Sequence, residues 1–155
     1  MSDATSPVIR RATRADGPAF LALVRALAEF EKLPPPDEAA EERLVEDAFG
    51  VEPRYELHVA ELHGAVIAYA ATFMAYSTFL ARPTLYLEDL FVAPAARRRG
   101  VAAAMLHALE QIARARGCGR FEWTVLDWNV DAQKLYQGIG ADLLPDWRVV
   151  RKKLG

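Results

Sequence analysis

Cysteine is almost absent from this sequence of 155 residues, and so are several patterns typical of particular functions. The single cysteine, Cys118, cannot form an internal disulfide, and no cysteines and histidines have the spacing of a zinc site. No apolar run reaches the ~20 residues needed to cross a bilayer. No basic start followed by an apolar stretch marks a signal peptide. We therefore expect a cytoplasmic protein with no metal and no membrane partner.

A basic excess is missing as well. The chain has 19 basic and 21 acidic side chains and a formal net charge of -2 at pH 7. A general nucleic-acid binder normally carries an excess of positive charge, so we expect no nucleic-acid partner. Hydrophobic residues make up 52% of the chain, which excludes disorder throughout. The length suits one domain, predicted over residues 7–155 after a frayed N-terminus at 1–6.

The periodicity of apolar residues predicts alternating strands and helices. The expected strands cover residues 8–12, 55–61, 65–76, 84–92, 121–126, 141–144 and 147–153. Four helices are expected: one after a capping box at Thr13 and Asp16, one from Asp37 to Gly50, one opening at 97–102, and one over 131–139. The order is β-α-α-β-β-β-α-β-α-β-β. Because three strands follow one another, we predict an α/β (α+β) domain with a mixed, mostly antiparallel central sheet flanked by helices.

The most informative stretch is residues 92–102, which leaves a strand, turns and enters a helix. The first N–H groups of a helix have no helical partner, and the helix dipole favours negative charge there. Gly100 and the small Ala102 would let a phosphate approach the backbone, and three arginines add positive charge. A pyrophosphate is the natural ligand. The alternative is a solvated run of arginines with Gly100 as a simple turn residue.

The pattern Arg97-x-x-Gly100-x-Ala102, after a strand ending Leu90-Phe91-Val92, resembles the acetyl-CoA signature of the GNAT superfamily of N-acetyltransferases. More narrowly, residues 85–92 together with Trp128-Asn129 and Tyr136 resemble the diamine (spermidine/spermine) and thialysine acetyltransferases and their bacterial relatives. The match is dense over residues 76–141 and colinear from 8 to 148.

The resemblance implies acetyl-CoA as co-substrate. In such proteins the loop N–H groups cradle the pyrophosphate. The strand at 88–92 carries a bulge and splays from the strand near 123–126, and the pantetheine arm lies in the gap. The cofactor-binding residues that the resemblance implies are Leu90, Phe91, Val92, Arg97, Arg98, Arg99, Gly100, Val101, Ala102, Asn129 and Tyr136.

The resemblance also implies an acid and a base. Tyr136, seven residues after Asn129, matches the tyrosine that protonates the departing thiolate; alternatively it packs as part of an apolar helix face. Asn129 can also cap the helix that follows it. Glu88 matches the acid that accepts the proton of the amine, a proton that an alkylammonium of pKa ~10.4 must lose before it attacks.

Strand alternation predicts that Glu88 and Asp89 point to opposite faces and therefore do not form a close carboxylate pair. We expect Glu88 to face the amine, and Asp89 to be a structural acid or a dimer contact. The alternative is that both acids pair with arginines. The implied substrate-binding residues are Phe30, Glu31, Tyr76, Glu88 and Asp89.

These residues predict an N-acetyltransferase that moves the acetyl group of acetyl-CoA to a small primary amine by direct attack in a ternary complex. The expected acceptor is a diamine, a polyamine or a lysine-like amino acid, and the resemblance implies a homodimer. Two alternatives stay open: the same fold acetylating a protein amine or an aminoglycoside, and a CoA-binding module without catalysis.

Overall fold

A computed structural model describes residues 6–155 of the chain. Of the segment 1–6, predicted to be frayed, all but Ser6 lies outside the described residues, and the domain expected over 7–155 stays a prediction. Backbone contacts divide the chain into two compact units, with the boundary in sequence between Trp123 and Thr124. No helix within residues 6–155 is long and apolar enough to cross a membrane.

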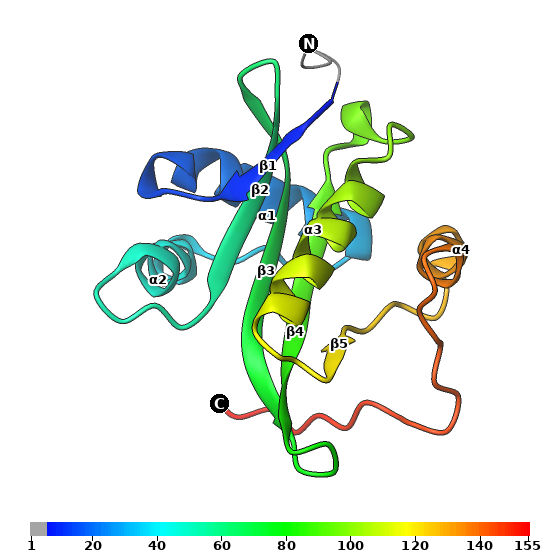
Figure 1. Cartoon of the computed structure of the whole chain (residues 1–155). Helices are drawn as coiled ribbons and strands as arrows, with labels where there is room; N and C mark the ends of the chain where they lie inside the picture. The colour runs from blue at the N-terminus through cyan, green and yellow to red at the C-terminus, as the bar shows by residue number, and fades with distance from the viewer. Residues whose placement is uncertain (1–5) are drawn as a thin grey trace. The chain divides into compact units, whose positions relative to one another are not determined.

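The first unit is built on a five-stranded sheet with helices on both of its faces (Figure 1). The strands lie side by side in the order of the sequence. Neighbours are antiparallel except β4 and β5, which are parallel. The strands are β1 (Val8–Arg11), β2 (Glu56–Leu62), β3 (Ala65–Ser77), β4 (Arg82–Val92) and β5 (Arg120–Glu122). The predicted α+β class, with a mixed and mostly antiparallel sheet, is confirmed.

The β2–β3 connection is a tight hairpin at His63-Gly64. Both residues have positive φ, 51° and 78° respectively. Two-residue turns of this kind match the twist of antiparallel strands, and glycine adopts a positive φ at no steric cost. This local signal therefore sets where β2 and β3 pair.

Two helices, α1 (Gly17–Glu31) and α2 (Glu38–Phe49), follow β1. The apolar face predicted for α1 packs on the sheet, where Phe20 contacts the ring of Tyr69 edge-to-face at 5.0 Å. The α2 helix begins as predicted, because the Asp37 carboxylate accepts a hydrogen bond from the Ala40 N–H at 2.8 Å.

The opposite face of the sheet is covered by α3 (Val101–Ala115), which crosses in front of the strands in Figure 1. Its apolar side is fully buried, with Met105 and Leu109 each at most 1% exposed. The helix is followed by Gly117, whose φ is 74°. There the N–H of Cys118 bonds to the carbonyl oxygen of Ala113, which is the hydrogen-bond pattern of a Schellman cap.

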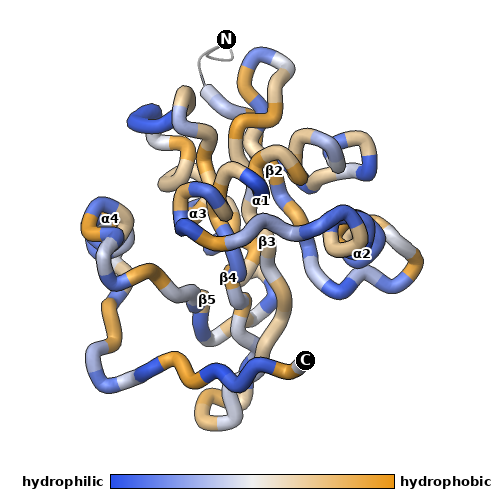
Figure 2. Tube along the Cα trace, turned by 180° about the vertical axis from the view of Figure 1, so that it is seen from behind, coloured by the Kyte–Doolittle hydropathy of each residue, from blue (hydrophilic) through white to orange (hydrophobic). Residues whose placement is uncertain are grey.

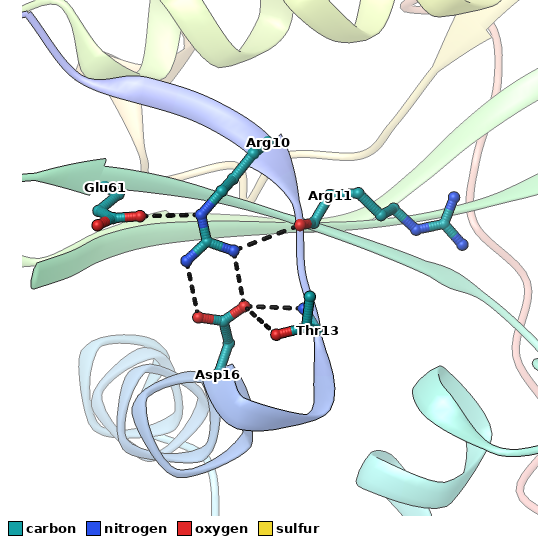
Figure 3. A network of polar contacts seen from close by, with 5 residues as sticks. All are labelled: Arg10, Arg11, Thr13, Asp16 and Glu61. Atoms are coloured by element: carbon teal, nitrogen blue, oxygen red, sulfur yellow. Dashed lines mark hydrogen bonds and ion pairs between the residues drawn. The ribbon is translucent and has the colours of Figure 1, made fainter. Parts of the chain in front are cut away.

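A partly buried ion-pair network joins β1, β2 and the start of α1 (Figure 3). The Arg10 guanidinium donates two hydrogen bonds to the Asp16 carboxylate, at 2.8 and 2.9 Å, and one to Glu61 at 2.9 Å. Asp16 also accepts the Thr13 N–H at 2.8 Å, which is one half of the predicted capping box. These contacts, the Arg10 hydrogen bond above all, lower the pKa of Asp16 to about 2.

The second unit contains α4 (Val130–Gly138), at the place predicted for the fourth helix. The two strands predicted over 141–144 and 147–153 are wrong. Figure 2 shows that apolar and polar stretches follow one another in this segment towards the C-terminus. A strand also needs a neighbouring backbone, and within the described residues the segment 141–155 forms no ladder with another strand. The strand predicted over 121–126 is shorter as well, ending at Glu122.

We expect Asp16→Asn to lower the free energy of unfolding at pH 7 by about 1–3 kcal/mol, because the buried carboxylate loses its charge-assisted bonds to Arg10. The folded pKa of Asp16 lies below the ordinary value of 3.8. Its contribution is therefore complete above pH 3.8 and is lost as the pH falls through about 2.

Urea unfolding of wild type and variant at several pH values measures this difference. The matched control is Glu61→Gln, which removes the more exposed partner of Arg10 and should cost less. A difference between Asp16→Asn and wild type that does not shrink towards pH 2 would contradict the assignment.

Candidate active site

One irregularity interrupts the long β3–β4 pairing. Asp89 lies opposite Ala71 and Leu87 lies opposite Thr72, so Glu88 is an extra residue in β4, as in a β-bulge. The resemblance implied a bulge in the strand 88–92, and the structure has it at the first of these residues. A bulge breaks the strict alternation of side chains along a strand.

A cavity of about 210 Å³ lies in the first unit between α1, α2 and the bulged part of the sheet. Its wall is mostly apolar, and the Tyr55 hydroxyl that reaches it donates to the Leu44 carbonyl oxygen at 2.6 Å. Two carboxylates supply the charge. The lining residues are Phe20, Val24, Leu44, Tyr55, Ala71, Phe73, Glu88 and Asp89. Such a cavity suits a short aliphatic chain that ends in a cation.

The prediction that Glu88 and Asp89 point to opposite faces is wrong. Both residues line the cavity, and the negative charge of Glu88 is one of the causes that raise the pKa of Asp89. The physical reason is the bulge, because alternation predicts opposite faces only where every residue of a strand has one partner. The two acids are therefore close enough to act on the same ligand.

Asp89 is partly buried and its carboxylate accepts a hydrogen bond from the Tyr69 hydroxyl at 3.3 Å. Burial first, and then the charges of Glu88 and Glu31, raise the pKa of Asp89 to about 6, against the opposing effect of the Tyr69 hydrogen bond. The carboxyl group thus changes charge close to neutral pH.

Three further predicted substrate-binding residues do not line this cavity: Phe30, Glu31 and Tyr76. Glu31, at the end of α1, acts electrostatically on Asp89, and burial raises the pKa of Glu31 itself. Phe30 is not among the lining residues; its ring lies 6.4 Å from that of Phe91. Tyr76 is 63% exposed near the end of β3, and it also does not line the cavity.

The side chain of Arg97 turns back towards the sheet. Its Nε donates to the Val92 carbonyl oxygen at 3.2 Å, and its guanidinium carbon lies 5.1 Å from the centroid of the Phe30 ring and 5.3 Å from that of Phe91. Contacts of a guanidinium with aromatic faces are each worth about 0.5–1 kcal/mol. Arg97 therefore fastens the loop after β4 to the end of α1.

The loop then enters α3 through Gly100, whose φ is 75°. A Cβ built on Gly100 would meet nothing within 4 Å, so the backbone here faces open space. The first helical hydrogen bond runs from the Ala104 N–H to the Gly100 oxygen at 3.0 Å, so the N–H groups of Val101 and Ala102 precede it. Arg98 and Arg99 are exposed. This geometry fits the pyrophosphate of coenzyme A.

On its other edge, β4 pairs with β5 only at its beginning, and within the described residues this ladder ends with Tyr86 opposite Glu122. The strand continues to Val92 and leads directly into the loop at 93–100. Leu90 is partly buried, whereas Phe91 and Val92 are buried. The backbone of residues 87–92 thus belongs to no β4–β5 ladder, which fits an edge that accepts an extended ligand.

Two predicted site residues belong to the second unit. Asn129 is the N-cap of α4, where its side-chain oxygen accepts the Ala132 N–H at 3.2 Å, as its alternative role predicted. Tyr136 lies about two turns further along the helix. It is partly buried, and burial raises its pKa, so the phenol keeps its proton at neutral pH.

Sequence reasoning missed Tyr69 and the apolar lining residues of the cavity. A tyrosine in the apolar stretch of β3 is a signal in itself, because a buried hydroxyl needs a partner. The sequence could not show that this partner is Asp89. In the part of the chain that the structure covers, no group of three or more His, Cys, Asp or Glu could hold a metal ion.

The five-stranded sheet, the bulge in β4 and the glycine-led start of α3 agree with the acetyltransferase fold that the resemblance implied. The family model of the acetyltransferase (GNAT) family matches residues 21–141, and the chain belongs to this family. It is an enzyme that transfers an acetyl group.

Relatives of established activity are similar over most of the chain. The thialysine N-epsilon-acetyltransferase of Bos taurus is 36% identical over 147 residues, which is 90% of this chain and 86% of the relative. The L-ornithine N5-acetyltransferase of Arabidopsis thaliana is 38% identical over 92 residues, 59% of this chain and 40% of the relative. Among solved structures, an aminoglycoside N-acetyltransferase in complex with CoA has the same fold, with a TM-score of 0.78 and 20% identity over 99% of each chain.

We expect Gly100→Asp to weaken coenzyme A binding roughly tenfold or more, about 1.4 kcal/mol, because the new carboxylate repels phosphate and the position has positive φ. Isothermal titration calorimetry with coenzyme A measures this. The matched control is Gly117→Asp at the other end of α3, where φ is also positive, at 74°. Equal losses in the two variants would indicate backbone strain and not a phosphate site.

Proposed function

We propose that this protein acetylates a small primary amine, a diamine, polyamine or lysine-like amino acid, with acetyl-CoA as donor. The observation that carries the proposal is the cavity, whose apolar wall and paired carboxylates Glu88 and Asp89 suit an aliphatic ammonium ion. The similarity to thialysine and ornithine acetyltransferases supports the same class of acceptor, since both act on amino acids with a side-chain amine.

In this proposal, one set of residues binds acetyl-CoA and another set binds the amine. Acetyl-CoA, when bound, supplies an acetyl group activated as a thioester. The loop N–H groups around Gly100 and the exposed side chains of Arg98 and Arg99 hold the phosphates, and the backbone of Leu90 to Val92 orients the arm. Phe20, Val24 and Leu44 exclude water from the methylene chain of the amine, which strengthens its attraction to the carboxylates.

Proton transfer is assigned to two side chains. Glu88 accepts the proton that the bound ammonium loses, which frees the nitrogen lone pair for direct attack in a ternary complex. Tyr136 donates its proton to the departing sulfur, and Asn129 contacts the coenzyme arm. Burial raises the pKa of Tyr136, so the phenol is protonated at working pH, as a proton donor must be.

We include a cytoplasmic location and a homodimer in this proposal. The β3–β4 turn presents apolar side chains to solvent, Phe79 at 93% and Tyr76 at 63% exposure, which is consistent with an acceptor site near a subunit contact.

The test of the function is an assay of thiol release from acetyl-CoA with a panel of amines. We expect turnover with short diamines, ornithine and lysine analogues. Aminoglycosides should react poorly, because a cavity of about 210 Å³ is too small for a multi-ring sugar. Coenzyme A binding without turnover on any amine would favour the non-catalytic module, and preference for an aminoglycoside would favour the alternative acceptor.

We expect Tyr136→Phe to lower kcat about a hundredfold, the low end of the range for general acid catalysis, with coenzyme A affinity unchanged. Steady-state kinetics and calorimetry measure the two quantities. Trp147→Phe is the control, because it changes an exposed aromatic side chain of the same unit to which no role in the site is assigned. Unchanged kcat in Tyr136→Phe would remove its role as the acid.

A further inference from the structure

The two carboxylates of the cavity differ in their surroundings. Glu88 is exposed, whereas Asp89 is partly buried and is held by the Tyr69 hydroxyl at 3.3 Å. Tyr69 cannot move aside, because it is fully buried in β3 and its ring packs edge-to-face on Phe20 at 5.0 Å. The bond occupies Oδ2 of Asp89, and a carboxylate has a second oxygen that can take up a proton.

Charged and titratable groups face Asp89 from each neighbouring element. Glu88 acts from the same strand and Glu31 from the end of α1, and both disfavour a second negative charge. Tyr69 donates from β3, and burial together with the charge of Asp89 keeps the pKa of Tyr69 above its ordinary value. Tyr55, before β2, likewise stays protonated, because burial and nearby carboxylates raise its pKa.

We propose that Asp89 is a second proton acceptor in the acetylation reaction, and that it holds the proton which the amine releases. The ammonium N–H bond breaks, its electron pair stays on nitrogen, and the proton forms an O–H bond with the Asp89 carboxylate, directly or by way of Glu88. The proton returns to solvent when the product leaves. This inference rests on the proposed function of the same cavity.

The chemical reason is the match between acceptor and working pH. General base catalysis is most efficient when the base ionises near the pH of the reaction. The raised pKa of Asp89, about 6, leaves the carboxylate ionised at neutral pH, yet a better acceptor than an ordinary aspartate. The bulge supplies the geometry, since it brings Asp89 and Glu88 to one cavity.

The pH dependence of kcat/KM with the best amine tests the proposal. The kcat/KM of wild type should fall as the pH is lowered through about 6, which gives the pH profile an acidic limb. We expect Tyr69→Phe to move this limb to higher pH, because the hydrogen bond that lowers the pKa of Asp89 is lost. Glu31→Gln should move the limb to lower pH, because a like charge is removed. Glu110→Gln, which removes an exposed acid on α3, is the control and should leave it in place.

Asp89→Asn should abolish the limb and reduce kcat/KM about a hundredfold. Glu88→Gln should retain a limb, moved to lower pH, because removing a like charge lowers the pKa of Asp89. Loss of the limb in Glu88→Gln together with its retention in Asp89→Asn would overturn the proposal and leave Glu88 as the sole acceptor.

A second readout needs neither acetyl-CoA nor turnover. The folded pKa of Asp89 lies above the ordinary value of 3.8, so wild type loses stability as the pH rises from about 4 through about 6. Asp89→Asn lacks this loss of stability. The difference in melting temperature between the variant and wild type should therefore change in favour of the variant as the pH rises over that range. A constant difference would overturn the proposal.

Failure of the inference and failure of the function give different results. Wild type that turns over no amine in the panel overturns the proposed function and this inference together. Normal turnover with a limb that moves in neither Tyr69→Phe nor Glu31→Gln overturns the inference alone.

Discussion

The extra residue that β4 accommodates at Glu88 is the constraint on which the site depends. In a regular strand one of two adjacent carboxylates would face α3 and the other α1. Burying either of them without a partner would cost several kcal/mol. The bulge instead brings Glu88 and Asp89 to one cavity, where the Tyr69 hydroxyl binds the more buried of the two. A local defect in pairing thus creates the charge that an ammonium ion would neutralise.

Strand β4 also connects the cavity proposed for the amine with the loop proposed for coenzyme A. After Asp89, β4 continues to Val92 and leads into the loop that opens α3 at Gly100. Arg97 holds this connection by its bond to the Val92 carbonyl and by its position against two aromatic rings, one of them from α1. The cavity proposed for the amine and the loop proposed for the phosphates are therefore fixed to each other by backbone and by one side chain, which would favour a defined reaction geometry.

Most of the fold could be predicted because its signals are local. The Asp37 cap, the His63-Gly64 turn and the Gly117 helix end each depend on residues within one turn of the chain, and all three appear in the structure. The strands predicted over 141–144 and 147–153 do not appear. Apolar residues are present in both segments, but a strand exists only where a second backbone meets its N–H and C=O groups, and side chains alone do not encode that partner.

The candidate site, like the fold, could be predicted from the sequence only in part. The sequence by itself determined the glycine-led helix start, the identity of the candidate acid and base, and the family, because these are short motifs at fixed spacing. The tertiary structure decided that Glu88 and Asp89 share a cavity, that Tyr69 binds Asp89, and that Arg97 stacks against α1. Each of these depends on register and burial between segments far apart in the chain, and one inserted residue in a strand reverses what alternation predicts.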